Sequence, residues 1–288
     1  MANIVIVGAG PAGISAALYA ARASIHTTVI YMGSGALKKA EKIENYYGFS
    51  QGISGEALES AGIKGAETVG AVMVKAQVVG FGFTDQLVVN TDQGDYPADS
   101  IIIATGASRV TPPIMGLEVY EGKGVSYCAV CDAFFYRKKK VAVVGAGAYA
   151  LHEVKELLPV VGKVDLLTNG EPLTVEFPPE VCIHTMKISA IMGGERVDGV
   201  RFEDGTLVEL QGIFIACGIA GSADLAKKIG IFTEKNKIII DSNMATNVPG
   251  VFAAGDCTGG MLQVCKAVYE GAKAGTEAIK YVRKKKNT

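Results

Sequence analysis

Two stretches of the chain show the same order of apolar and small residues. Each begins with an apolar run, at residues 4–7 and 141–144, passes through closely spaced glycines, and enters a helical pattern, at 14–24 and 151–158. A second apolar run follows each helix pattern, at 27–31 and 163–168. Strand, glycine turn, helix and strand in this order predict a Rossmann-type nucleotide-binding unit. Because the two stretches begin 137 residues apart, the pattern predicts a duplicated unit.

The remaining patterns indicate how the two units are connected. Further strand patterns lie at 87–90, 100–104, 213–216 and 237–240, and the last helix pattern runs from about 263 to 282. A single core seldom grows beyond about 250–300 residues, and the proline pair at 112–113 marks a linker. The sequence therefore predicts an α/β fold of two Rossmann-like three-layer domains, the second inserted into the first. We expect the first domain to hold residues 1–111 plus 244–288, and the second to hold 112–243.

Composition narrows the class of protein. The chain is 49% hydrophobic and 20% charged, as in a globular protein, and 28 basic residues nearly balance 29 acidic ones. This balance does not favour a nucleic-acid or membrane partner. The apolar runs are shorter than the ~20 residues of a spanning helix, and the first residues lack the basic region of a signal peptide. We therefore expect a cytoplasmic protein.

The first glycine turn has the spacing Gly-x-Gly-x-x-Gly at Gly8, Gly10 and Gly13. The first glycine permits the tight turn, the second lets backbone approach a pyrophosphate, and the third allows the helix to pack on the strand. Pro11 suits a first helical turn. A turn without ligand is the alternative, but the flanking strand and helix favour a dinucleotide site. The acidic residue that often recognises ribose after the next strand is absent, because Tyr31 and Met32 stand there.

An aspartate near the last helix favours flavin as the dinucleotide. Asp256 follows Gly255 at the end of an apolar run, shortly before the final helix pattern. Its carboxylate can accept hydrogen bonds from a ribityl chain. The simpler interpretation is a helix N-cap, which is a common role for aspartate.

The pair Cys128 and Cys131, followed by Asp132, carries the candidate chemistry. In a cytoplasmic chain an isolated Cys-x-x-Cys indicates a redox or metal site and not a structural crosslink. A thiolate beside a helix N-terminus attacks disulfides, and a neighbouring carboxylic acid can protonate a leaving thiol. Zinc is disfavoured, because the three histidines are scattered and Cys182 is expected to have no partner nearby, so no metal is expected. We interpret Cys257 and Cys265 as packing residues.

These motifs together resemble the low-molecular-weight thioredoxin reductase family over nearly the whole chain. The resemblance is carried by residues 8–13, 43–49, 103–107, 124–132, 247–256 and 263–264. It implies a homodimer, thioredoxin as partner, FAD in the domain built from both chain ends, the redox pair in the inserted domain, and a rotation between the domains. It also implies Cys131 as the flavin-side sulfur, Cys128 as the thiol that attacks thioredoxin, and Asp132 as the proton carrier. The FAD contacts that the resemblance implies are Gly8, Gly10, Pro11, Ala12, Gly13, Gly35, Ala36, Leu37, Asn45, Val78, Ala104, Thr105, Gly106, Gly255, Asp256, Gln263 and Val264.

The second glycine turn departs from the NADPH-dependent members of that family. Those members carry a small polar pair after the turn and a His-Arg-Arg cluster after the next strand, where arginines grip the 2′-phosphate. Here Ala148 and Tyr149 follow the turn, and residues 168–172 hold Glu171 but no arginine. Glu171 would repel a phosphate, and the Tyr149 ring would stand where the pyrophosphate should lie. We therefore expect a Rossmann scaffold that has lost its nucleotide.

The pattern resembles the ferredoxin-dependent flavin thioredoxin reductases of anaerobic bacteria. That resemblance implies reduced ferredoxin as electron donor, and flavin is suited to accept single electrons. Lys38 and Lys39 could steer such an acidic partner, whereas the basic runs at 137–140 and 283–286 are interpreted as solvated surface. Two alternatives stay open: a thioredoxin reductase that uses NADH or NADPH, and a non-catalytic flavin redox sensor, which the intact Cys-x-x-Cys-Asp disfavours.

Overall fold

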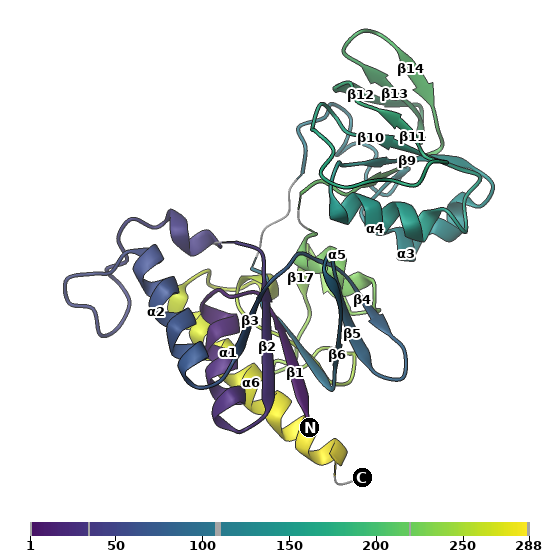
Figure 1. Ribbon diagram of the computed structural model, residues 1–288. Coiled ribbons are helices and arrows are strands. Elements are labelled where there is room, and N and C mark those ends of the chain that lie inside the picture. The colour runs from purple at the N-terminus through teal and green to yellow at the C-terminus, as the bar shows by residue number, and fades with distance from the viewer. Residues whose placement is uncertain (1, 34, 107–110, 219, 287–288) are drawn as a thin grey trace. The chain divides into compact units, whose positions relative to one another are not determined.

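The chain folds as two units, one inserted into the other (Figure 1). The structure is a computed structural model that describes residues 2–33, 35–106, 111–218 and 220–286. Unit 1 is built from residues 1–108 and 221–288, and unit 2 from residues 109–220. The return to unit 1 thus lies at 220/221 and not at the predicted 243/244. Residues 221–243 belong to unit 1 because they pack there; the Lys228 Nζ, for example, donates to the Val79 carbonyl at 2.9 Å.

Unit 1 centres on a parallel sheet of five strands. The strand order is β18 (Val251–Ala253), β7 (Ser100–Ile103), β1 (Asn3–Val7), β2 (His26–Tyr31) and β3 (Val72–Lys75). The unit also contains an antiparallel sheet of β4 (Val78–Phe83), β5 (Leu87–Thr91) and β6 (Gly94–Ala98), and a short ladder of β16 (Thr233–Glu234) and β17 (Lys237–Ile238). Its helices are α1 (Pro11–Arg22), α2 (Gly55–Thr68), α5 (Ser222–Lys227) and α6 (Val264–Lys286), with 3-10 turns η1 (Ala36–Lys39) and η3 (Asp256–Thr258).

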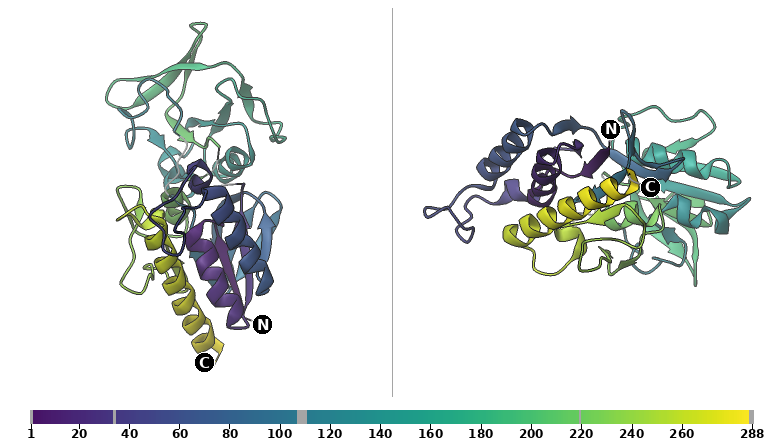
Figure 2. Two further views of the ribbon diagram at one scale, coloured as in Figure 1. Left: turned by 90° about the vertical axis from the view of Figure 1, so that its left-hand side faces the viewer. Right: turned by 90° about the horizontal axis from the view of Figure 1, so that it is seen from below.

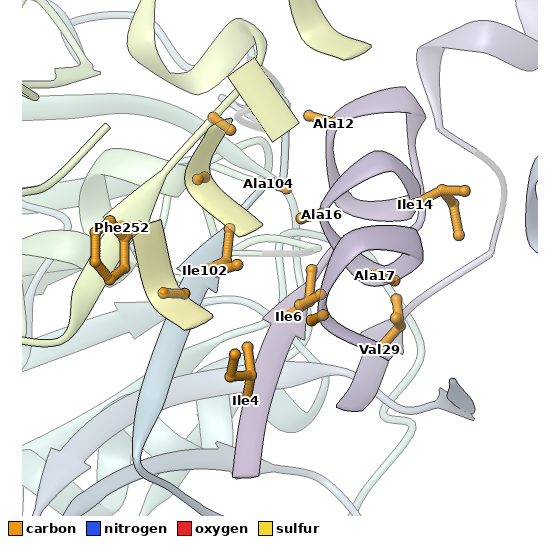
Figure 3. Close-up of a cluster of buried hydrophobic side chains, with 14 of the residues drawn as sticks. Ile4, Ile6, Ala12, Ile14, Ala16, Ala17, Val29, Ile102, Ala104 and Phe252 are labelled. Carbon is orange, nitrogen blue, oxygen red and sulfur yellow. The ribbon is translucent and has the colours of Figure 1, made fainter. Parts of the chain in front are cut away.

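Small residues allow α1 and α6 to pack side by side on the sheet. Ile4 and Ile6 of β1 and Ala16 of α1 are fully buried in one apolar cluster (Figure 3). Helix α6 runs beside α1, although the two come from opposite ends of the chain (Figure 2). A Cβ on Gly271 of α6 would stand 2.0 Å from the Ala12 carbonyl oxygen. The backbones therefore approach so closely because glycine faces α1, and this joins both chain ends in one core.

Unit 2 repeats the arrangement around a second parallel sheet. The strand order is β11 (Cys182–His184), β10 (Lys163–Leu167), β9 (Lys140–Val144), β15 (Gly212–Ile215) and β8 (Val125–Ser126). An antiparallel sheet holds β12 (Ile188–Gly193), β13 (Val197–Phe202) and β14 (Leu207–Glu209), and the helical elements are α3 (Ala129–Asp132), η2 (Ala133–Tyr136) and α4 (Ala148–Leu157).

The predicted duplication is confirmed by the equivalent elements. β1 pairs in parallel with β2 across α1, and β9 pairs in parallel with β10 across α4. Right-handed crossover through a helix is the usual connection of such strands. The α/β class with two Rossmann-like units is therefore confirmed. Within the described residues, no helix is both long and apolar enough to cross a membrane.

Candidate functional site

Cys128 and Cys131 form a disulfide at the start of a short helix in unit 2. Their Cα atoms are 5.3 Å apart, and the Cys131 amide donates to the Cys128 Sγ at 3.2 Å. Strand β8 ends at Ser126, and α3 begins at Ala129, so Cys128 occupies the N-cap position. Cys128 is buried and Cys131 is exposed. The exposed sulfur is thus the one that a reductant can reach first.

Asp132 belongs to the same hydrogen-bonded turn as the disulfide. The Ser126 hydroxyl donates to the Asp132 Oδ2 at 2.6 Å, and the Cys128 amide donates to the Ser126 Oγ at 3.1 Å. Ser126 therefore links the carboxyl group to the backbone of the buried cysteine. Asp132 therefore lies beside the redox pair, and the Ser126 side chain connects the two.

Helix α4 holds the backbone on both sides of Cys128. The Tyr149 hydroxyl donates to the Tyr127 carbonyl at 3.1 Å, and the Glu153 Oε2 accepts from the Ala129 amide at 2.7 Å. Tyr149 is 3% exposed, so its ring is turned into the protein. The expectation that this ring would stand in the pyrophosphate position is therefore wrong, because the ring instead packs toward the redox segment.

The first glycine turn has the geometry of an open dinucleotide cradle. A Cβ on Gly8 would lie 2.3 Å from the Ala104 carbonyl oxygen, and a Cβ on Gly13 would lie 1.8 Å from the Gly8 carbonyl oxygen. A Cβ on Gly10 would meet nothing within 4 Å. Gly10 is also the N-cap of α1, which has no side-chain cap bond among the described residues. The turn is therefore tight where the protein packs and open where an anion would meet the helix N-terminus.

The structure gathers most of the predicted cofactor residues at one edge of unit 1. Strands β1, β7 and β18 are neighbours in the parallel sheet, so the segments after their carboxyl ends lie together. These segments carry Gly8, Gly10, Pro11, Ala12, Gly13, Ala104, Thr105, Gly106, Gly255 and Asp256. Ligands in open α/β sheets bind at this edge.

The other predicted cofactor residues approach from the loop before α2 and from the start of α6. The Asn45 amide donates to the Gln263 Oε1 at 3.0 Å. A largely apolar cavity of about 150 Å³ is lined by Gly10, Pro11, Leu37 and Val264, among others. Gly35 and Ala36 lie at the start of η1, beside Leu37. Val78 begins β4, three residues after β3 ends at Lys75, and therefore follows the carboxyl end of another strand of the same parallel sheet.

Three side chains that sequence reasoning missed shape the cofactor edge. The Lys266 Nζ donates to the carbonyl oxygens of Gly255 and Gly259 at 2.8 and 2.6 Å. The Glu270 Oε2 accepts from the Gly255 amide at 2.8 Å and pairs with the Lys266 Nζ at 3.0 Å. Ser222 accepts from the Thr105 hydroxyl at 2.7 Å. Only the i,i+4 spacing of Lys266 and Glu270 was visible as a sequence signal.

The second glycine turn meets a segment of its own chain. The Thr174 amide donates to the Ala146 carbonyl at 3.0 Å, and a Cβ on Gly147 would lie 3.1 Å from the Thr174 Oγ1. Glu171 of the same loop is close enough to raise the pKa of Cys217, together with the larger effect of burial. The loop after β10 therefore brings Thr174 to the turn that meets a pyrophosphate in a nucleotide-binding unit.

Cys182 has neighbours that the sequence did not reveal. Its Sγ lies 3.6 Å from the His184 Nε2, which lies 3.1 Å from the Oδ2 of the buried Asp165. The expectation that Cys182 has no partner nearby is therefore wrong, because His184 on its own strand lies beside it and Asp165 on the adjacent strand contacts that histidine. The ammonium groups of Lys140 and Lys163 lie 2.9 and 3.6 Å from the same carboxylate. The two lysine ammonium groups would repel a metal ion at this carboxylate. The absence of a metal site therefore stays the prediction.

The free cysteines are expected to differ sharply in reactivity. Burial raises the pKa of Cys257 to about 12 and that of Cys217 to about 11. Because only the thiolate is nucleophilic, roughly a thousandth or less of either thiol is reactive at pH 8. Iodoacetamide at pH 8 should label the exposed Cys182 and Cys265 in the oxidised protein. Peptide mapping by mass spectrometry checks this, and rapid labelling of Cys257 in folded protein would contradict it.

An open glycine turn in one Rossmann-like unit and a Cys-x-x-Cys disulfide in the other define the protein as a disulfide oxidoreductase. Residues 2–271 match the family described as pyridine nucleotide-disulphide oxidoreductase. The chain belongs to this family, and within it to the thioredoxin reductases.

Sequence relatives and solved structures match this chain over nearly its full length. Thioredoxin reductase of Aquifex aeolicus is 34% identical, over 99% of this chain and 94% of its own. The crystal structure of the atypical thioredoxin reductase TRi from Desulfovibrio vulgaris Hildenborough is 41% identical, with a TM-score of 0.91 and 99% of each chain covered. A ferredoxin-flavin thioredoxin reductase from Clostridium acetobutylicum is 29% identical, with a TM-score of 0.70, over 99% of this chain and 98% of its own.

Proposed function

We propose that this protein reduces thioredoxin through the Cys128–Cys131 disulfide, with FAD as cofactor and reduced ferredoxin as electron donor. The observation that carries the proposal is the difference between the two glycine turns. The first is open at Gly10, whereas the second is met by Thr174 of its own chain. A homodimer and a cytoplasmic location stay predictions; cytoplasmic disulfides are mostly transient and catalytic, which suits this pair.

The residues of unit 1 fit a flavin dinucleotide. The uncapped start of α1 and the open face of Gly10 suit the pyrophosphate. Asp256 follows β18 at the same edge, where its carboxylate would hold the ribityl hydroxyls. The clamp of Lys266 and Glu270 on the Gly255 segment would keep that aspartate in place. When bound, FAD would supply the electron pair that reduces the disulfide.

The disulfide chemistry follows from the order of the two sulfurs. Two electrons and two protons break the Sγ–Sγ bond, and the exposed Cys131 is the sulfur attacked first. Asp132, which Ser126 holds beside the pair, would deliver or take a proton. Cys128 then attacks a disulfide sulfur of thioredoxin and forms a mixed disulfide. Cys131 attacks the Cys128 sulfur, re-forms the internal disulfide and releases thioredoxin as the dithiol.

The choice of donor rests on unit 2. NADPH needs fixed cations for its 2′-phosphate, and residues 168–172 offer Glu171 but no arginine. The Thr174 contact would also have to open before a pyrophosphate could approach Gly147. A one-electron protein donor requires neither feature. Lys38 and Lys39 end η1, beside the predicted cofactor residue Leu37, and could attract an acidic iron–sulfur protein there.

An anaerobic reduction experiment tests the donor. Reduced ferredoxin, NADH and NADPH are added in turn to the purified flavoprotein, and the flavin absorbance is followed with and without thioredoxin. We expect ferredoxin to bleach the flavin and to support thioredoxin reduction, and both nucleotides to fail at micromolar concentration. Rapid bleaching by NADH or NADPH would establish the nucleotide-dependent alternative. If no donor supports thioredoxin reduction, the non-catalytic redox sensor is favoured.

A further inference from the structure

Helix α4 carries a buried carboxylate that contacts the redox turn. Tyr149 and Glu153 are one helical turn apart and reach the carbonyl before Cys128 and the amide after it. In a nucleotide-binding unit this helix serves the pyrophosphate with its N-terminus. Here the side chains of α4 instead hydrogen-bond the backbone of the redox turn. The helix of the second Rossmann-like unit therefore has a role that requires no bound nucleotide.

Glu153 places a carboxyl group directly on the redox turn. Its side chain is 1% exposed, and its Oε2 accepts from the Ala129 amide at 2.7 Å. That amide belongs to the peptide that joins Cys128 to α3, so the carboxylate lies next to the cysteine. An amide used by a carboxylate no longer stabilises a thiolate, and a nearby negative charge in a desolvated position disfavours a second one.

We propose that Glu153 keeps the Cys128–Cys131 pair strongly reducing by disfavouring the thiolate form of Cys128. In Cys-x-x-Cys proteins a stabilised thiolate stabilises the dithiol state and makes the disulfide a stronger oxidant. A protein that must pass electrons onward to another disulfide needs a less stable thiolate, so that its dithiol state is a stronger reductant. This inference rests on the proposed disulfide chemistry and makes Glu153 a positioning residue that sets the direction of electron flow.

Glu153 differs from the other ionisable groups near the pair in its direct hydrogen bond to the peptide that follows Cys128. Asp132 of α3 is half-buried and bonded to Ser126. Tyr136 of η2 has its pKa raised by burial and by Asp132 and lowered in part by Arg196, so it is neutral near pH 7. Tyr149 of α4 contributes its hydroxyl, which donates to the Tyr127 carbonyl. Glu153 is thus the carboxylate that acts on the Cys128 peptide itself.

Redox titration of E153Q against a dithiothreitol buffer tests the proposal. Glutamine keeps the shape and an acceptor for Ala129 but removes the charge. We expect the midpoint potential of the pair to become less negative, by about 30 mV for each tenfold change in the equilibrium constant. We also expect the alkylation of Cys128, followed against pH by mass spectrometry, to shift about one pH unit lower. In the wild type this alkylation should titrate near or above the pH of a free cysteine.

Two control variants separate charge from position. E156Q removes a half-exposed carboxylate on the same helix, which faces His152 and not the redox turn, and should change neither readout. Y149F removes the contact with Tyr127 without a change of charge and should move the potential less than E153Q does. An unchanged potential in E153Q, an equal shift in Y149F, or a wild-type Cys128 that titrates below pH 7 would overturn the proposal. These readouts need no donor and no thioredoxin, so a wrong donor or substrate leaves them interpretable.

Discussion

Replacing Cys131 with serine is expected to stop thioredoxin reduction and to leave thioredoxin covalently attached through Cys128. Without the Cys131 sulfur, the mixed disulfide on Cys128 has no internal thiol to resolve it. Turnover should fall at least about 10³-fold, because a serine hydroxyl cannot take over the redox and resolving steps of the Cys131 sulfur. Incubation of reduced C131S with a thioredoxin disulfide, followed by non-reducing electrophoresis and peptide mass spectrometry, identifies the adduct.

The matched variants decide the order of the two sulfurs. C128S should lose activity equally but form no stable adduct with thioredoxin. C265S removes an exposed cysteine outside the pair and should retain wild-type activity. If C128S accumulates the adduct and C131S does not, the roles of the two cysteines are reversed. If neither accumulates it and both remain active, the pair is not the route to thioredoxin.

Adding one methyl group to the first glycine turn should have opposite consequences at two positions. In G13A the new Cβ stands 1.8 Å from the Gly8 carbonyl oxygen, so backbone of β1 or α1 must shift. We expect the free energy of unfolding to fall by about 3 kcal/mol or more, as for overpacked cores. In G10A the Cβ meets nothing within 4 Å, and φ of −74° suits alanine. Its fold should stay intact while flavin affinity drops at least about tenfold, because the methyl group projects toward the pyrophosphate position.

Denaturant unfolding of the apoproteins and flavin fluorescence titration measure these two effects separately. G13A should lose stability even without flavin, whereas apo G10A should unfold like the wild type. G65A is a suitable control, because its Cβ would meet only the end of the Leu18 side chain, at 3.9 Å. Wild-type flavin affinity in G10A would mean that the cofactor lies elsewhere.

The sequence was sufficient for features that depend on local pattern. The runs at 4–7 and 141–144 predicted β1 and β9, and the glycine spacing after each predicted the turns that α1 and α4 follow. Strands and glycine turns both depend on neighbouring residues, because a run of apolar side chains or a set of closely spaced glycines determines the local backbone conformation. The Cys-x-x-Cys disulfide was predictable for the same reason: its two partners are three residues apart.

Features that depend on distant contacts were missed or misplaced. Glu153 meets Ala129 across 24 residues, and Thr174 meets Ala146 across 28. Helical periodicity shows which side of α4 is buried, but it does not name the backbone that a buried carboxylate meets there. The boundary predicted at 243 failed similarly, because the contact between Lys228 and Val79 joins residues 149 positions apart. The direction of the Tyr149 ring likewise depends on a tertiary contact, its hydrogen bond to the Tyr127 carbonyl.

The close fit of α6 against α1 has a consequence for biosynthesis. Gly271 packs against the Ala12 backbone, and β18 pairs with β7. The core around the N-terminal strand and helix is therefore incomplete until residues beyond 250 have been synthesised. Unit 2 comprises one continuous segment and is synthesised before those residues. Domains generally fold as units during synthesis. The disulfide unit can therefore fold first, while the newly made N-terminal strand and helix stay incomplete until the final helix emerges to cover them.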